Sequence, residues 1–208
     1  MPVETIIVTI RHAHTRYNAE KRYAGTIDVP LSEKGIREAR EASARLAGIA
    51  FDVVITSTLR RSIDTARLLV GESTPLVQSA LCNERNFGSL EGLTWDEAQS
   101  LDPPVLFIQV GNDRHSVNPR GGEPFEAVWE RAKKLRRWIF REFKGTKILI
   151  VSHGVFLQMF HGVLRGLSCI ESLAAYPSSR EFTIFRFSGQ RLAEEKTVWL
   201  EGTEEVQW

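Results

Sequence analysis

Histidines follow two of the most apolar segments of the chain, and an arginine stands directly before the first of them. Arg11 and His12 come after residues 5–10, and His153 follows residues 147–152. Apolar runs of this length, rich in β-branched residues, predict buried strands, and open α/β sheets bind ligands at the carboxyl ends of their strands. A guanidinium matches phosphate oxygens with two parallel donors, and a neutral imidazole is a nitrogen nucleophile. The two segments therefore predict phosphoryl transfer to and from nitrogen.

Polar segments with many hydrogen-bond donors surround these strand ends. Asn18 lies in a polar loop after the first predicted strand, and residues 22–26 continue that loop. Residues 57–62 form a turn that opens a predicted helix, where backbone N–H groups favour an anion. Cations are unfavourable at this end of a helix dipole. Arg60 and Arg61 are therefore either two solvated arginines or part of an anion site.

Other phosphatase chemistries lack their sequence signatures. Neither Cys82 nor Cys169 is followed six residues later by arginine, no Asp-x-Asp follows a predicted strand, and the glycine-rich nucleotide motifs are missing. His12 and His14 alternate on an extended segment and should point to opposite faces, with no nearby carboxylate to complete a metal site. We expect no metal, and two free thiols rather than a disulfide.

Composition limits the class of protein. The chain has 208 residues, of which 42% are hydrophobic and 25% charged, with a net charge of +1, so we expect no general attraction to nucleic acid or membrane. No apolar stretch approaches the roughly 20 residues that a membrane helix needs, and the N-terminus has no basic signal region. The length predicts a single domain over residues 1–208, and we expect it to be cytoplasmic.

Predicted strands alternate with predicted helices along most of the chain. Two helices have apolar stripes, one over Ile36, Ala39, Ser43 and Leu46 and one over Ile63, Ala66 and Val70. Further strands are predicted at 52–56 and 75–78, further helices at 125–143 and 155–164, and a closing hairpin at 181–187 and 192–200. This order predicts a largely parallel sheet covered on both faces, with an antiparallel edge. Residues 84–123 show no clear period and are predicted to fold over the site.

Six segments resemble, in order, the motifs of the histidine phosphatase superfamily, the phosphoglycerate-mutase-like group. They are residues 11–18, 22–35, 57–66, 81–92, 121–123 and 151–154. The first resembles the R-H-G-x-T-x-x-N signature, with Ala13 in place of the usual glycine. Ser62 and Pro124 also depart from the motifs, but no departure removes a reacting group. The resemblance covers about residues 3 to 165, and it aligns Arg61 rather than Arg60 with the pocket arginine.

The resemblance implies a three-layer α/β/α sandwich with a small cap drawn from about residues 85–122. It implies hydrolysis of a small phosphorylated metabolite through a phosphohistidine, without metal or organic cofactor. His12 would attack phosphorus, while Arg11, Arg61 and His153 would surround the phosphate oxygens. Glu84 would protonate the leaving group and then activate water.

The resemblance also implies further substrate contacts, from Asn18, Ala24, Gly25 and Gly154. Selectivity is expected from cap residues, which are Arg85, Phe87, Phe107, Arg114 and His115. Phe107 is the one of these that we expect to lie in the core of the cap. The oligomeric state is left open, with a homodimer among the alternatives.

Two other functions remain open at this point. One is a bisphosphoglycerate-dependent mutase, and the other is a non-catalytic module that binds a phosphorylated ligand. Members of the family that are mutases have a longer insertion after the catalytic glutamate, with a lysine and a pair of adjacent arginines. Here residues 85–122 contain Arg85, Arg114 and Arg120 but no lysine and no adjacent pair. The resemblance therefore favours a phosphatase.

Overall fold

A six-stranded sheet forms the centre of the protein in the computed structural model, which describes residues 3–46, 48–174, 176–177 and 181–200. The strand order is β3-β2-β6-β1-β7-β8. The strands are β1 (Glu4–Arg11), β2 (Val53–Thr56), β3 (Leu76–Gln78), β6 (Lys147–Ser152), β7 (Glu181–Ser188) and β8 (Arg191–Trp199). The first four in the sheet order are parallel, whereas β7 runs antiparallel to both β1 and β8. The predicted parallel sheet with an antiparallel edge hairpin is confirmed.

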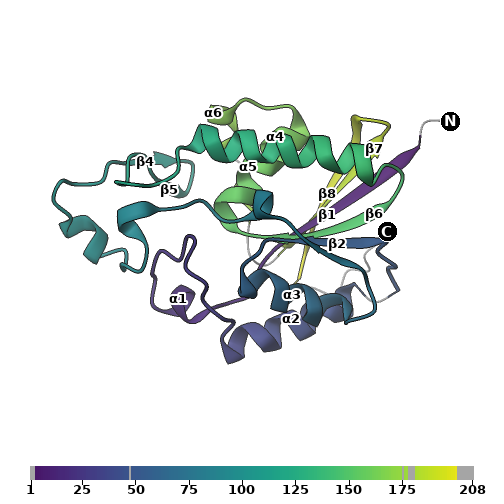
Figure 1. The fold of residues 1–208 in the computed structure, drawn as a ribbon, viewed down its shortest axis with the longest axis horizontal. Helices are drawn as coiled ribbons and strands as arrows, with labels where there is room; N and C mark the ends of the chain where they lie inside the picture. The colour runs from purple at the N-terminus through teal and green to yellow at the C-terminus, as the bar shows by residue number, and fades with distance from the viewer. Residues whose placement is uncertain (1–2, 47, 175, 178–180, 201–208) are drawn as a thin grey trace.

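Helices cover both faces of this sheet and make the expected three layers (Figure 1). The helices α4 (Phe125–Glu142) and α5 (Gly154–Arg165) pack on one face against side chains that include Ile7, Ile148 and Ile150. On the other face α2 (Glu33–Arg45) and α3 (Arg60–Val70) pack in a cluster with Val8, Leu149 and Val151. Successive residues of the central strands therefore serve opposite cores, which explains why these strands are apolar throughout.

The buried stripes of α2 and α3 differ from the predicted ones. In α2 the buried residues are Gly35, Ala39 and Ala42, so Ala42 takes the place expected for Ser43. In α3 they are Arg61, Ser62, Thr65, Ala66 and Leu69. The polar members of that set form hydrogen bonds in the interior, for example from the Ser62 hydroxyl to the Val151 carbonyl at 2.6 Å. Of the predicted stripes, Ala39, Leu46 and Ala66 are buried as expected, whereas the other members are only partly buried, namely Ile36, Ser43, Ile63 and Val70.

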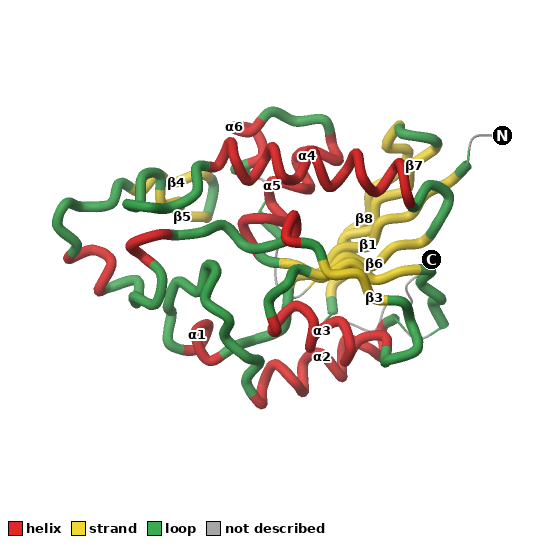
Figure 2. The backbone as a smooth tube through the Cα atoms, in the orientation of Figure 1, coloured by secondary structure: helices red, strands yellow, loops and turns green. Residues whose placement is uncertain are grey.

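Residues 85–122 form a cap with little regular structure (Figure 2). A small two-stranded sheet, β4 (Phe107–Val110) with β5 (Asp113–Ser116), is its main element and was not predicted. Short helices flank the site: α1 (Arg16–Ala19), α6 (Cys169–Ser172) and the 3₁₀ turns Ala80–Cys82, Gly88–Leu90 and Glu97–Ser100. The cap hairpin and α1 lie at the same end of the molecule. Cys82 and Cys169 are free, as expected.

No helix in the part of the chain that the structure describes is long and apolar enough to cross a membrane.

Candidate active site

The carboxyl ends of β1 and β6 bring the two predicted histidines together. Arg11 is the register partner of Ser152, and the His12 amide donates to the Ser152 carbonyl at 2.8 Å. The ring centroids of His12 and His153 are therefore only 5.1 Å apart. Because β1 and β6 are parallel neighbours in the sheet, they bring two residues that are far apart in the sequence close together.

The ring of His12 is held in one tautomer. Its Nδ1 lies 2.8 Å from the Ala13 carbonyl oxygen, which only accepts, so Nδ1–H donates and Nε2 retains its lone pair. Burial lowers the pKa of His12 well below its usual value of 6.5, with smaller contributions from Arg61 and Arg11. The imidazole is consequently neutral near pH 7. This is the state in which a histidine acts as a nucleophile.

His153 lies behind this group, and both of its ring nitrogens have partners. Arg61 Nε donates to His153 Nδ1 at 3.2 Å, so Nε2 carries the proton and donates to the Ser57 hydroxyl at 2.7 Å. His153 is fully buried, and burial, followed by the charge of Arg61, lowers its pKa well below the usual value. The ring therefore orients Arg61 in this structure.

Arg61, rather than Arg60, points into the site. Its side chain is fully buried, while that of Arg60 is exposed. Two guanidinium nitrogens of Arg61 donate to the Ile27 and Gly25 carbonyls, each at 2.7 Å. Each of these terminal nitrogens has a second N–H, so Arg61 retains two donors for an anion. Arg61 therefore borders the cavity, whereas Arg60 does not.

Arg11 and Asn18 border the same cavity with free donors. The Arg11 guanidinium lies 5.9 Å from the ring centroid of Tyr176 and forms no ion pair with any described residue. Asn18 Oδ1 accepts from the backbone N–H and hydroxyl of Thr15, at 2.9 and 2.8 Å. Those bonds orient the Asn18 side chain, so its amide NH₂ is the group available to a ligand.

Glu84 is held at the N-terminus of α5. Its carboxylate accepts hydrogen bonds from the backbone N–H groups of Phe156 at 3.1 Å, Val155 at 3.3 Å and Arg85 at 2.8 Å. The side chain is buried, with 8% exposure, yet it borders the cavity. These backbone N–H groups at the helix N-terminus hold the Glu84 side chain in one position. Glu84 therefore has a fixed place beside His12 and Arg61.

Residues 24–26 form one wall of the site and are attached to the cap by Glu91. The Glu91 carboxylate accepts from the Thr26 amide at 2.8 Å, from the Thr26 hydroxyl at 2.8 Å and from the Phe87 amide at 3.0 Å. Gly25 has a φ of +50°, and a Cβ there would collide with the Glu91 carboxylate. Glycine is therefore required by both conformation and space.

Gly154 has a different role from the one expected. It does not border the cavity, and a Cβ on it would collide with the Tyr176 hydroxyl. The glycine therefore makes room for Tyr176 rather than for a ligand. Tyr176 in turn lines the cavity beside Arg11.

The cavity above His12 has a volume of about 470 Å³, which suits a small metabolite. It is bordered by most of the predicted site residues, namely Arg11, His12, Asn18, Ala24, Gly25, Arg61 and Glu84. His153 and Gly154 lie behind it. Of the expected selectivity residues, Arg85, Phe87, Arg114 and His115 border it. Phe107 does not, and it is half-buried beneath Arg114 rather than a core residue.

Comparison with known proteins agrees with this arrangement. The family model of the histidine phosphatase superfamily (branch 1) matches residues 7–198. The chain belongs to the histidine phosphatase superfamily.

Proteins that this chain resembles are named for different activities. A 2,3-bisphosphoglycerate-dependent phosphoglycerate mutase from Rhizobium etli is 31% identical over 208 residues, covering 95% of this chain and 98% of the relative. The alpha-ribazole phosphatase from Shigella flexneri has the same fold, with a TM-score of 0.77 at 24% identity over 90% of this chain and 93% of that one. A mycobacterial glucosyl-3-phosphoglycerate phosphatase also matches, with a TM-score of 0.77 at 23% identity over 96% and 100% of the two chains.

Several residues of the candidate site have no role that follows from the sequence alone. Ser57 and Thr65 lie in a matched motif, and the structure shows that they support His153 and the Ala13 amide, respectively. Tyr176 lies 22 residues after Gly154 and is itself in neither a helix nor a strand. No spacing or periodicity signals Tyr176, because only the folded chain brings it to the site.

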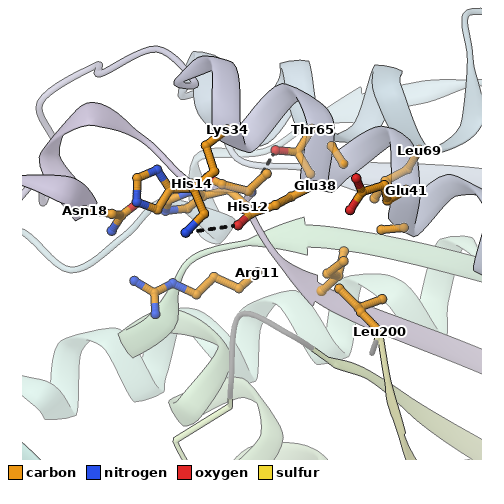
Figure 3. Close-up of a pocket in the computed structure, with 14 residues that line it drawn as sticks. Arg11, His12, His14, Asn18, Lys34, Glu38, Glu41, Thr65, Leu69 and Leu200 are labelled. Carbon is orange, nitrogen blue, oxygen red and sulfur yellow. Dashed lines mark hydrogen bonds and ion pairs between the residues drawn. The ribbon is translucent and has the colours of Figure 1, made fainter. Parts of the chain in front are cut away.

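A second, smaller cavity of about 250 Å³ lies between the end of β1 and the helices α2 and α3 (Figure 3). Arg11, His12 and Asn18 border both cavities. This one continues along α2, past the ion pair between Lys34 and Glu38 at 3.6 Å, toward the end of β8. It lacks Glu84 and Arg61. The larger cavity is therefore the candidate reaction site.

Proposed function

We propose that the protein is a phosphatase that hydrolyses small phosphate monoesters through a phosphohistidine on His12. The observation that supports this most strongly is the neutral His12 ring, with Nδ1–H held by a carbonyl and Nε2 unprotonated. This nitrogen lies in a site that also contains Arg11, Arg61 and the carboxylate of Glu84. No further group is needed for a two-step transfer.

In the first step, Nε2 of His12 attacks phosphorus as the bond from phosphorus to the ester oxygen breaks. Arg11 and the free N–H groups of Arg61 stabilise the charge on the non-bridging oxygens. Glu84 donates a proton to the leaving alkoxide, so the alcohol departs neutral. His153 holds Arg61 in place for this step, because its Nδ1 accepts a hydrogen bond from Arg61 Nε.

In the second step, water attacks the phosphohistidine. Glu84, now a carboxylate, accepts a proton from the water as the new P–O bond forms and the P–N bond to His12 breaks. Inorganic phosphate leaves, and Glu84 is protonated again for the next cycle. The same side chain thus acts as acid in one step and as base in the other.

The mutase is the second candidate, because curated relatives such as the Rhizobium etli protein have that name. A mutase must shield its phosphohistidine from water while the substrate reorients. Residues 85–122 contain three arginines and no lysine, and they contain no adjacent arginine pair. The cap is therefore less basic than the mutase motif requires, and this favours transfer of the phosphoryl group to water.

The decisive experiment is a screen of phosphorylated metabolites for phosphate release, together with 3-phosphoglycerate assayed with and without 2,3-bisphosphoglycerate. We expect phosphate release that needs no bisphosphoglycerate. Rapid, bisphosphoglycerate-dependent isomerisation with negligible phosphate release would instead identify a mutase. A generic aryl phosphate tests the third alternative, because a module that only binds phosphorylated ligands would not turn it over.

A further inference from the structure

Tyr176 brings a phenolic hydroxyl to the cavity that contains His12. The residue lies between α6 and β7, outside the six segments that resemble the family motifs. The two-step transfer proposed above leaves this hydroxyl without a role. Its contribution therefore has to be judged from its own contacts.

The hydroxyl of Tyr176 and the guanidinium of Arg11 converge on one point beside the first residue of α5. A Cβ added to Gly154 would lie 2.0 Å from the Tyr176 hydroxyl oxygen and 3.4 Å from Cζ of Arg11. The same guanidinium lies 5.9 Å from the centroid of the Tyr176 ring. The hydroxyl is thus close to a cation that would bind oxygens of the phosphoryl group.

This hydroxyl is free to bind a ligand. It forms no hydrogen bond within the part of the chain that the structure describes. It is also not among the unpartnered polar atoms that are fully buried, so it is open to the cavity that the side chain lines. A phenol can donate one hydrogen bond, and the protein leaves that donor unused.

The hydroxyl keeps its proton near neutral pH. Burial raises the pKa of Tyr176, and the positive charge of Arg11 offsets this shift only in part. A guanidinium has donors and no acceptor, so a ligand atom that meets both Arg11 and this O–H group must itself be an acceptor. A phosphate oxygen meets that requirement.

The position along α5 separates this hydroxyl from the leaving group. Glu84, which would protonate the departing oxygen, is held by the backbone N–H groups of Val155 and Phe156. The Tyr176 hydroxyl lies instead against Gly154, on the side of Arg11. It is therefore directed at the oxygens of phosphate that stay with phosphorus.

We propose that Tyr176 is a further catalytic residue, whose hydroxyl donates a hydrogen bond to a non-bridging oxygen of the transferred phosphoryl group beside Arg11. This inference rests on the proposed function. A fixed neutral donor stabilises the charge on these oxygens in both steps, and it adds no third cation to a site that already contains Arg11 and Arg61.

The test is Tyr176→Phe, which removes the hydroxyl and keeps the ring. Calorimetry measures the affinity for inorganic phosphate, which we expect to weaken about tenfold, as for the loss of a hydrogen bond to a charged group. Rapid-quench measurement of phosphohistidine formation should show a fall of about ten- to a hundredfold. The factor should be the same for an alkyl and an aryl phosphate, because their non-bridging oxygens are identical.

Tyr23→Phe is the matched control, since it removes a second tyrosine hydroxyl from the same cavity. The Tyr23 ring packs against Phe87, with centroids 5.4 Å apart, and the charge that acts on its hydroxyl is that of Arg114 in the cap. The affinity of this variant for inorganic phosphate should equal that of the parent. Equal weakening in both tyrosine variants would contradict a specific contact from Tyr176.

Tyr176→Leu separates the ring from the hydroxyl. A role of the ring alone, as support for Arg11, predicts that Tyr176→Phe matches the parent and that Tyr176→Leu loses affinity. That result overturns the proposal, and so does a loss confined to alkyl phosphates, because the hydroxyl would then act on the leaving oxygen. Binding of inorganic phosphate does not depend on turnover, so failure of the phosphatase activity is distinguishable from failure of the Tyr176 contact.

Discussion

The chemistry of a single residue depends on which of its atoms already form hydrogen bonds. His12 uses Nδ1 for a carbonyl and leaves Nε2 free, whereas His153 uses both ring nitrogens. Two histidines 5.1 Å apart can therefore have different roles, one as nucleophile and one as support for Arg61. Residue type alone does not distinguish them, since both follow a strand and both are buried.

Replacement of Glu84 by Gln should affect substrates unequally. Alkyl phosphates need a proton on the leaving oxygen, while aryl phosphates with good leaving groups need it far less. We expect Glu84→Gln to lower the rate of phosphohistidine formation by about 10²–10⁴ for alkyl phosphates and much less for aryl phosphates. Rapid-quench measurement of the first alcohol released isolates this step. Equal losses on both classes would mean that Glu84 only positions the substrate.

The neighbouring arginines of α3 offer an internal control. Arg61→Ala removes a buried donor pair from the phosphate, and we expect kcat/KM to fall about 10²–10³-fold, as for other preorganised donors to a transition state. Arg60 is exposed, so Arg60→Ala should change kcat/KM by about twofold at most. Steady-state kinetics on one aryl phosphate measures both variants. The opposite ranking would contradict the geometry of the site.

Among the elements, the contact between residues 24–26 and the cap determines the shape of the cavity. Backbone pairing of Tyr23 with Glu91 and of Arg22 with Thr94 continues this contact. The Glu91 carboxylate connects Thr26 to Phe87, and Gly25 accepts from Arg61. Hydrogen bonds therefore connect the wall of the site both to the cap and to Arg61.

Glu91→Ala should loosen this wall without removing a reacting group. We expect kcat/KM to fall about tenfold, by the same factor for alkyl and aryl phosphates, because the loss concerns placement of the phosphate. Asp96→Ala is the control, since Asp96 is an exposed carboxylate of the same cap that does not border the cavity. A loss that depends on the leaving group would indicate that Glu91 takes part in proton transfer instead.

Elements with a strong apolar signal were predictable, and those without it were not. The strands β1 and β6 are buried on both faces, so their positions follow from continuous apolar runs. The cap hairpin has largely exposed strands joined at Gly111 and Asn112. A two-residue Gly-Asn turn is itself a hairpin signal, but the flanking residues lack the alternation that would confirm it.

The same reasoning applies to the site. His12, Arg61 and Glu84 were predictable because they lie in motifs that resemble a known family. Tyr176 was not, and the position of Phe107 beneath Arg114 was not either, since both depend on packing between segments that no motif describes. The sequence therefore predicted the residues at the strand ends better than the packing of the segments around them.

For the molecule as a whole, buried neutral histidines make stability depend on pH. Burial lowers the pKa of His161 to about 3, and its Nε2 lies 2.8 Å from the Thr9 hydroxyl in the core. A histidine whose folded pKa is depressed takes up a proton more readily when unfolded. Stability from its neutral form is therefore present above the unfolded pKa of about 6.5, and it is lost as pH falls from there toward 3.

His161→Gln should remove that dependence while leaving a polar partner for Thr9. Between pH 6 and pH 4, the free energy of unfolding should fall less steeply in the variant than in the parent, by about 1.4 kcal/mol per pH unit. Urea unfolding at several pH values gives both slopes. Parallel slopes would show that His161 is protonated equally in the folded and unfolded states.

The central claim is that phosphate passes through His12. The direct measurement is to quench the enzyme during turnover of a ³²P-labelled monoester and to digest it under alkaline conditions, which preserve an acid-labile phosphate. Mass spectrometry of the labelled peptides then locates the phosphate. The account predicts an acid-labile phosphate on His12, absent from the His12→Ala variant. Label on a serine or aspartate, or turnover with no labelled enzyme at any time point, would contradict it.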